Sequence, residues 1–273
     1  MRNGFNLLSR DSPPSSNLEV ARYNVIGTDV SAIDLTMAAS VVDRWIAGKG
    51  SHYICVADVH SIMEGHEDAR LRRILNNAGL VTPDGMPLVW LGRLFGHPGV
   101  ARVYGPDLLR HLCHHGVARG YRHYFYGGGE GVAQKLERAL TREIAGNQVC
   151  GTTSPSYRAA GSLEDETILD QISAASPDIV WIGLGAPKQE RWMADHVGRI
   201  RAPVLIGVGA AFDFIAGTKR QAPLWMQRNG LEWAFRLASE PRRLWRRYLQ
   251  IIPRFLVLVS LQLLHIRRFE IVH

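Results

Sequence analysis

Cysteine is scarce in this chain, which holds three thiols among 273 residues. Cys55, Cys113 and Cys150 stand far apart and their number is odd, so the sequence offers neither a disulfide framework nor a Cys-x-x-Cys pair for a metal. We therefore expect reduced thiols in a cytoplasmic protein. The first residues contain no apolar run of the kind found in signal peptides, and we expect residues 1–20 to form a disordered leader.

Long hydrophobic runs are also missing. The longest apolar stretch is FLVLVSLQLLHI at residues 255–266, which falls well short of the roughly 20 residues that span a bilayer. We therefore expect no membrane-spanning helix.

Metal-binding patterns are equally sparse. The chain contains no Asp-x-Asp motif, and the cluster at residues 111–115 places only His111 and His115 on one helical face, without an acidic partner. We expect neither a metal site nor a cofactor. Any bound diphosphate must then be neutralised by arginine, lysine and backbone amides.

Positive charge, by contrast, is abundant and concentrated at one end. The formal net charge is +7, and residues 231–273 contribute eight arginines, three acidic residues and no lysine. Such a segment indicates a negatively charged or interfacial partner. Because no RNP motif, paired zinc ligands or helix-turn-helix signature accompanies it, we expect no nucleic-acid partner.

Short apolar runs alternate with longer helical patterns along the middle of the chain. The predicted strands cover residues 23–27, 53–57, 123–128, 148–152, 178–185 and 203–209. The helical patterns that follow the first three cover residues 35–48, 60–79 and 130–146. This alternation predicts an α/β fold with a mostly parallel sheet that helices cover on both faces.

The pattern changes near residue 230. Gly230 and Pro241 delimit two short helical stretches, and we expect Pro253 to open a third. We therefore predict one domain over residues 21–230, followed by a basic, amphipathic helical appendage over residues 231–273.

Glycine is enriched at the ends of three predicted strands, in YGGG at 126–129, GLG at 183–185 and GVG at 207–209. Ligands of open α/β sheets bind at the carboxyl ends of strands, where glycine lets backbone N–H groups approach a phosphate. Any one stretch taken alone is better explained as a tight strand-to-helix turn, but the three together favour a nucleotide ligand. No Gly-x-Gly-x-x-Gly fingerprint or P-loop is present. The candidate ligand-binding glycines are Gly127, Gly128, Gly185 and Gly209.

Several polar residues follow or flank these strands. Asp84 stands in TPDGMPLVW at 82–90, where it either caps a turn or acts as a general base at the mouth of the sheet. Arg102, in RVYGPDLL, could face a phosphate, whereas Asp107 in the same stretch is best explained as a helix cap.

Two later stretches also carry candidate ligand-binding residues. Lys188 and Gln189 stand beside a glycine turn at the start of a predicted helix, which suits an anionic, polyhydroxyl ligand. Asp213 follows the last predicted strand, where it either hydrogen-bonds a ribose hydroxyl or serves as a helix N-cap or as a partner in a buried ion pair.

Taken in order, six of these motifs resemble a known family. They are PDGMPLVW, RVYGPDLL, FYGG, GLGAPKQERW, GVGAAFDFIAG and LEWAFRLASEPRRLWRRY. Over about residues 24–250 the chain resembles the WecG/TagA/CpsF family of bacterial glycosyltransferases. The resemblance implies a Rossmann-like sheet and an inverting, metal-independent enzyme. It also implies a UDP-sugar donor and an undecaprenyl-diphosphate-linked saccharide acceptor, used at the inner face of the cytoplasmic membrane in exopolysaccharide or cell-surface polysaccharide synthesis.

The same resemblance implies roles for individual residues of the domain. By motif position, Asp84 is the expected catalytic base, and Arg102 and Gln189 lie around the donor and the reaction centre. Asp213 occupies a nucleotide-contacting position.

For the appendage, the resemblance implies that Arg236, Arg243 and Arg247 belong to a segment that closes over the active site on the membrane. Arg243 and Arg247 stand four residues apart on one helical face. We predict that these two side chains clamp a diphosphate in bidentate fashion.

One departure bears on the donor sugar. The family commonly has Thr-x-Asn beside the donor sugar, where this chain has Val56 and Asp58. With the hydroxyl and the amide lost, UDP-glucose becomes at least as good a candidate as UDP-N-acetylmannosamine.

Two other function classes remain open at this point. One is a different sugar-nucleotide or dinucleotide enzyme, such as an epimerase or oxidoreductase. The other is a non-catalytic basic module that binds lipid. The sequence also leaves open whether the chain forms a homo-oligomer.

Overall fold

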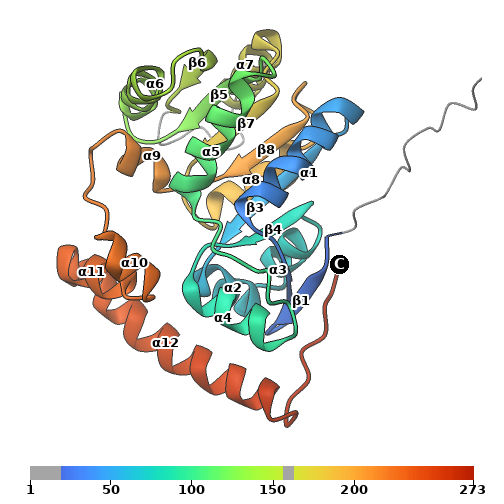
Figure 1. Cartoon of the computed structure of the whole chain (residues 1–273), viewed down its shortest axis with the longest axis vertical. Helices are drawn as coiled ribbons and strands as arrows, with labels where there is room; N and C mark the ends of the chain where they lie inside the picture. Colours follow the sequence, from blue (N-terminus) through green and yellow to red (C-terminus); the bar gives the residue numbers. More distant parts are fainter. Residues whose placement is uncertain (1–19, 156–162) are drawn as a thin grey trace, which may run out of the picture.

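The centre of the protein is a six-stranded parallel sheet (Figure 1). The structure, a computed structural model, describes residues 20–155 and 163–273, so the predicted leader lies outside the described residues except for residue 20. In spatial order the strands are β4 (Leu80–Pro83), β3 (His52–Ala57), β8 (Val204–Gly207), β7 (Ile179–Gly183), β5 (Arg122–Gly127) and β6 (Gln148–Thr153). The predicted α/β fold is confirmed.

Helices cover both faces of this sheet, because its strands alternate buried side chains between two clusters. Along β3, Tyr53 and Cys55 belong to one cluster, and Ile54 and Val56 to the other. The Tyr53 face is covered by α2 (Val59–Glu67), α3 (Ala69–Asn76), α4 (Met86–Leu94), α7 (Leu163–Ala175) and α8 (Lys188–His196). The Ile54 face is covered by α1 (Leu35–Gly48), α5 (Gly105–Val117), α6 (Val132–Glu143) and α9 (Ala211–Ile215).

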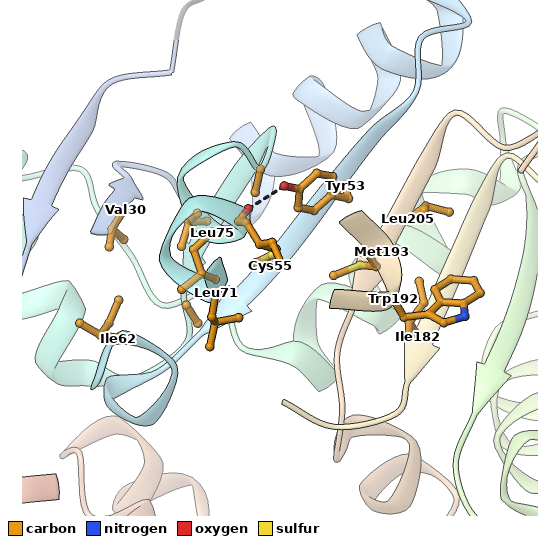
Figure 2. Packing of buried hydrophobic residues seen from close by; sticks show 14 of the residues in the cluster. Val30, Tyr53, Cys55, Ile62, Leu71, Leu75, Ile182, Trp192, Met193 and Leu205 are labelled. Atoms are coloured by element: carbon orange, nitrogen blue, oxygen red, sulfur yellow. Dashed lines mark hydrogen bonds between the residues drawn. The ribbon is translucent and has the colours of Figure 1, made fainter. Parts of the chain in front are cut away.

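Figure 2 shows the packing on the Tyr53 face. Leu71 and Leu75 of α3 lie against Cys55, and the Tyr53 hydroxyl donates a hydrogen bond to the carbonyl oxygen of Ile74 at 2.6 Å. A buried hydroxyl with a backbone acceptor fixes the position of α3 along β3, so the loop that follows β3 starts from a rigid base.

The strand predicted at 23–27 was expected to join the parallel sheet, and that expectation is wrong. β1 (Arg22–Val25) pairs antiparallel with β2 (Thr28–Ser31) in a separate hairpin. Ile26 and Gly27 form its two-residue turn with φ of 51° and 85°, the backbone conformation that a tight hairpin turn requires.

The helix predicted over 60–79 is two helices. Asp68 separates α2 from α3 because its carboxylate accepts hydrogen bonds from the backbone N–H groups of Arg70 and Leu71 at 2.8 and 3.1 Å. The strand β4 follows α3 and was not predicted as a strand, because it has only four residues and ends in Pro83.

Three helices follow α9: α10 (Leu224–Arg228), α11 (Glu232–Ser239) and α12 (Pro241–Leu263). The expectation that Pro253 opens a new helix is wrong, since α12 runs through it. Pro253 lies on the exposed side of α12. Phe255 and Val259 are buried against the domain, and this packing stabilises the continuous helix. Within residues 20–155 and 163–273, no helix is long and apolar enough to cross a membrane.

The far end of α12 is fastened to the β1–β2 hairpin. The Gln262 amide donates to the carbonyl oxygen of Asn24 at 2.8 Å and accepts from the Ile26 N–H at 2.9 Å. Beyond the helix, the Asn24 amide donates to the carbonyl oxygen of Phe269 at 2.6 Å. The chain after α12 therefore runs back along β1 (Figure 1).

Candidate active site

The carboxyl ends of β3 and β8 form a topological switch point. The chain leaves β3 toward α2 on one face of the sheet, and it leaves β8 toward α9 on the other. Such a divergence opens a crevice at the carboxyl edge, where ligands of open α/β sheets bind. Asp58 follows β3, and Asp84 follows the neighbouring strand β4.

A cavity of about 420 Å³ lies at this edge, enclosed by α2, α4, α11 and α12. One end is polar, and its lining includes Asp58, Asp84, Arg102, Glu232 and Arg236. The rest is apolar and is lined mainly by Trp90, Leu91 and Leu94 of α4 and by Ile251, Ile252, Phe255, Leu256 and Val259 of α12. The cavity thus joins a charged end to a hydrophobic groove.

Asp84 sits at the polar end on a rigid turn. Its N–H donates to the carbonyl oxygen of Ala57 at 2.9 Å, which ties the turn to the end of β3. Burial raises the pKa of the Asp84 carboxyl to about 7; Arg102 and Arg236 oppose the rise, and Glu232 and Asp58 add to it. A carboxyl group with this pKa can accept a proton near neutral pH.

The Arg102 side chain contacts both the backbone and the side chain of Asp84. Its Nε donates to the carbonyl oxygen of Asp84, and its Nη2 lies 3.5 Å from Asp84 Oδ1 and 2.5 Å from Glu232 Oε2. The Nη1 donates to Gln227 Oε1 at 3.3 Å, and the guanidinium lies over the Tyr104 ring at 4.0 Å. The side chain is therefore occupied by protein groups on several sides.

Asp58 and Arg236 complete the polar end. Asp58 caps α2, accepting from the backbone N–H of Ser61 at 2.9 Å and from its hydroxyl at 3.2 Å. Burial alone would lower the pKa of the Arg236 guanidinium, but nearby acidic groups, Asp58 foremost, raise it. Arg236 is thus held as a cation among acids.

The glycine-rich strand ends lie side by side. The Gly128 N–H donates to the carbonyl oxygen of Gly183 at 2.9 Å, and a Cβ on Gly127 would come within 2.7 Å of the Gly183 backbone. Gly127 also has φ of 124°, so a side chain is excluded twice over. Close packing therefore accounts for these glycines, and the N–H groups of Gly128, Gly185 and Gly209 all donate to oxygen atoms of the protein.

Gln189 lies between the ends of β7 and β8. Its Oε1 accepts from the Gly185 N–H at 3.2 Å, and its Nε2 donates to Glu190 Oε1 at 3.0 Å. Glu190 is 2% exposed, and its burial raises the pKa of the carboxyl to about 7. The sequence indicated Gln189 but not that its orientation is set by a buried acid next to it.

The remaining predicted site residues lie away from the cavity lining. Val56 is buried within β3, and Lys188 is exposed at the start of α8. The carboxylate of Asp213 accepts from the Thr218 hydroxyl at 2.9 Å and pairs with Lys219 at 3.1 Å. This is an ion pair, but it is partly exposed and not buried as the alternative expected.

The arginines of α12 also point elsewhere. Arg243 pairs with Glu240 at 2.8 Å and is 64% exposed, and Arg247 is exposed as well. Neither belongs to the cavity lining, whereas Arg236 does.

The polar cavity residues that were not predicted from the sequence include Gln227, Glu232 and Tyr248. Glu232 directly precedes Trp233 within the last motif, LEWAFRLASEPRRLWRRY, in which only arginines were predicted as site residues. An acid at the head of an otherwise basic segment was the available signal.

Comparison with known proteins assigns the chain to a family. The profile of the Glycosyl transferase WecG/TagA/CpsF family matches residues 23–269. The chain belongs to this family. It is accordingly a glycosyltransferase, as the order of its motifs predicted.

Curated relatives within the family share one description, N-acetylglucosaminyldiphosphoundecaprenol N-acetyl-beta-D-mannosaminyltransferase. The protein of that name from Bacillus spizizenii is 30% identical over 208 residues, 76% of this chain and 78% of the relative. That from Bacillus subtilis is 30% identical over 187 residues, 68% and 70% of the two chains. A Staphylococcus aureus relative is 22% identical over 242 residues, 88% and 92%.

Proposed function

We propose that this glycosyltransferase moves a sugar, with inversion, from a UDP-sugar to a saccharide linked to undecaprenyl diphosphate in the synthesis of a cell-surface polysaccharide. The observation that carries the proposal is Asp84, whose carboxyl has a pKa of about 7 at the point where the polar end meets the hydrophobic groove. The names of the curated relatives support the acceptor class.

In the proposed reaction Asp84 takes the proton from an acceptor hydroxyl. The hydroxyl oxygen then forms a bond to the anomeric carbon of the donor, and the bond from that carbon to UDP breaks on the opposite face. UDP leaves with the bonding electron pair, and Arg236 is the cation in the cavity that faces the developing negative charge. Asp84 later releases its proton to solvent.

Substrate placement follows from the two ends of the site. We place the UDP of the donor at the glycine-rich strand ends, with Gln189 beside them, because ligands of open α/β sheets bind at this edge. The glycines concerned are Gly127, Gly128, Gly185 and Gly209. The groove between α4 and α12 suits the first units of a polyprenyl chain, because its lining is aliphatic and aromatic. Lys188 and Asp213 stay proposed donor contacts at the rim.

The identity of the donor sugar, UDP-glucose or UDP-N-acetylmannosamine, needs a separate test. The relatives' names specify a mannosaminyl donor, whereas Asp58 of this chain presents a carboxylate to the polar end of the cavity. A screen of UDP release with UDP-glucose and UDP-N-acetylmannosamine, each with an N-acetylglucosamine-diphospholipid acceptor, decides between them. UDP release that depends on the acceptor supports the transferase. Conversion of the donor into another UDP-sugar, without UDP release, favours an epimerase.

The reaction is expected to need no divalent cation. Within the two described ranges, no group of three His, Cys, Asp or Glu side chains gathers to hold one, and arginines lie at the cavity instead. Transfer rates should therefore be equal with and without EDTA. Loss of activity on chelation, restored by Mg²⁺ or Mn²⁺, contradicts this mechanism.

Residues 231–273 are proposed as an appendage that rests on the inner membrane surface. α12 exposes apolar side chains, among them Trp245, Leu249 and Leu256, alongside arginines. This composition suits helices that lie in an anionic interface, where each basic residue contributes about 1 kcal/mol at low salt. The proposed lipid-chain groove would then open at the membrane.

Replacing Arg243 and Arg247 together by Ala tests this placement. The two exposed charges should contribute about 2 kcal/mol, so partitioning onto anionic vesicles should weaken roughly 30-fold. Sedimentation with vesicles of phosphatidylglycerol and phosphatidylcholine measures the effect, and 0.5 M NaCl should abolish the difference. Arg119→Ala, an exposed arginine remote from α12, is the control; equal binding of the double variant and wild type overturns the placement.

A further inference from the structure

Arg102 stands between two carboxylates, and it lies much closer to one of them. Its Nη2 is 2.5 Å from Glu232 Oε2 but 3.5 Å from Asp84 Oδ1. The shorter distance is that of a strong charge-assisted hydrogen bond, and the longer one is at the limit of bonding. All three side chains are largely shielded, with 16%, 16% and 23% exposure for Arg102, Glu232 and Asp84.

Glu232 reaches this position from the other side of the cavity. It lies in the first turn of α11, 130 residues from Arg102, and its Oε1 also accepts from the Tyr104 hydroxyl at 3.4 Å. The neighbouring Trp233 lines the cavity. When α11 packs against the domain, the Glu232 carboxylate therefore meets the Arg102 guanidinium.

We propose that Glu232 is a positioning residue for the transfer reaction: by holding the Arg102 guanidinium, it prevents a close ion pair between Arg102 and Asp84 and leaves the Asp84 carboxylate able to take a proton. The inference rests on the proposed role of Asp84 as the base. This role of Glu232 also couples the two sides of the cavity, because Asp84 can act as a base only when α11 is packed against the domain.

The charged and titratable groups that face Asp84 come from several elements. They are Asp58 and His60 at the start of α2, Arg102 and Tyr104 before α5, Glu232 and Arg236 of α11, and Tyr248 of α12. Of these, Glu232 acts on Asp84 in two ways. Its negative charge disfavours a second negative charge nearby, and it competes for the cation that would stabilise that charge.

Glu232→Gln should consequently make Asp84 a weaker base. The substitution removes a negative charge and releases Arg102 toward Asp84, and both changes lower the pKa of the Asp84 carboxyl. Because the base must be ionised to act, the acid limb of the kcat/KM profile should move to lower pH by about one unit or more. The plateau rate should fall as well, since a weaker base removes the proton less readily.

The experiment measures acceptor-dependent UDP release by the full chain between pH 5 and 9. Arg102→Gln is the opposing variant: removing the cation should move the acid limb to higher pH. Glu240→Gln is the matched control, because Glu240 is the C-cap residue of α11 and pairs with Arg243 outside the cavity. The acid limb of this variant should coincide with that of wild type.

An acid limb that stays in place in Glu232→Gln, whatever the plateau does, overturns the inference and leaves Glu232 a structural contact. Should that variant fail to fold, Arg102→Gln carries the test, and an unmoved limb there has the same consequence. The proposed function fails separately, by wild-type turnover in Asp84→Asn. If Asp84→Asn is inactive and neither limb moves, only the role of Glu232 is lost.

Discussion

Replacing Asp84 by Asn should lower the rate of sugar transfer about 10²- to 10⁴-fold, the contribution usual for a general base. The amide preserves the shape of the side chain but cannot accept a proton from the acceptor hydroxyl. Donor binding should stay within a few-fold of wild type, because the proposed UDP surface lies at the glycine-rich ends of β5, β7 and β8. Steady-state kinetics together with calorimetric titration of UDP separate the two effects.

The thermal stability of the same variant gives an independent test of the raised pKa of Asp84. The pKa of the Asp84 carboxyl is raised from 3.8 to about 7 in the folded protein. The wild type therefore loses stability as pH rises through this interval, because the native state resists ionisation that the unfolded chain accepts. Asn is neutral at every pH, so Asp84→Asn should have the higher Tm at pH 8 and lose that advantage near pH 4. A Tm difference independent of pH, with wild-type transfer rates, contradicts the assignment.

Replacing Arg236 by Ala should be the second most damaging change, lowering kcat about 10²- to 10³-fold, the loss observed when one charge-stabilising donor is removed from a reaction centre. Arg236 lines the polar end of the cavity and is surrounded by acidic groups that keep it cationic. In the proposed mechanism it meets the charge that develops on the leaving diphosphate. Its loss should therefore appear in kcat more than in the KM of the donor.

Arg243→Ala is the matched control for Arg236→Ala. Both remove one arginine from the helices after the sheet, but Arg243 is exposed and pairs with Glu240. With a short-chain, water-soluble acceptor, Arg243→Ala should retain wild-type kcat, because membrane binding no longer matters. Equal losses in the two variants would show that the effect is one of overall charge and not of position.

Much of the domain was predictable because its signals are local. The alternation of apolar runs and helical patterns gave the parallel sheet, and 35–48 was predicted as a helix with the bounds of α1. Motif order indicated Asp84 and Arg102, which the structure brings together at the polar end of the cavity.

Three of the misses share a physical cause, namely contacts between distant parts of the chain. Nothing near Glu232 indicates that Arg102, 130 residues earlier, receives its carboxylate. The path of α12 through Pro253 depends on the burial of Phe255 and Val259 against the domain, which outweighs the local preference of proline to begin a helix. Periodicity likewise could not distinguish a hairpin strand at 22–25 from a strand of the main sheet.

The attachment of α12 to the β1–β2 hairpin has a consequence for the order in which the molecule assembles. Asn24 finds its partner in Phe269, 245 residues later, and contacts of such sequence separation form slowly because a long loop must close first. The sheet strands end at residue 207, so the domain can fold on the ribosome while α12 is still being synthesised. The groove between α4 and α12 forms only when α12 docks on the folded domain. A nascent chain therefore lacks the groove that we propose for the acceptor until α12 is in place.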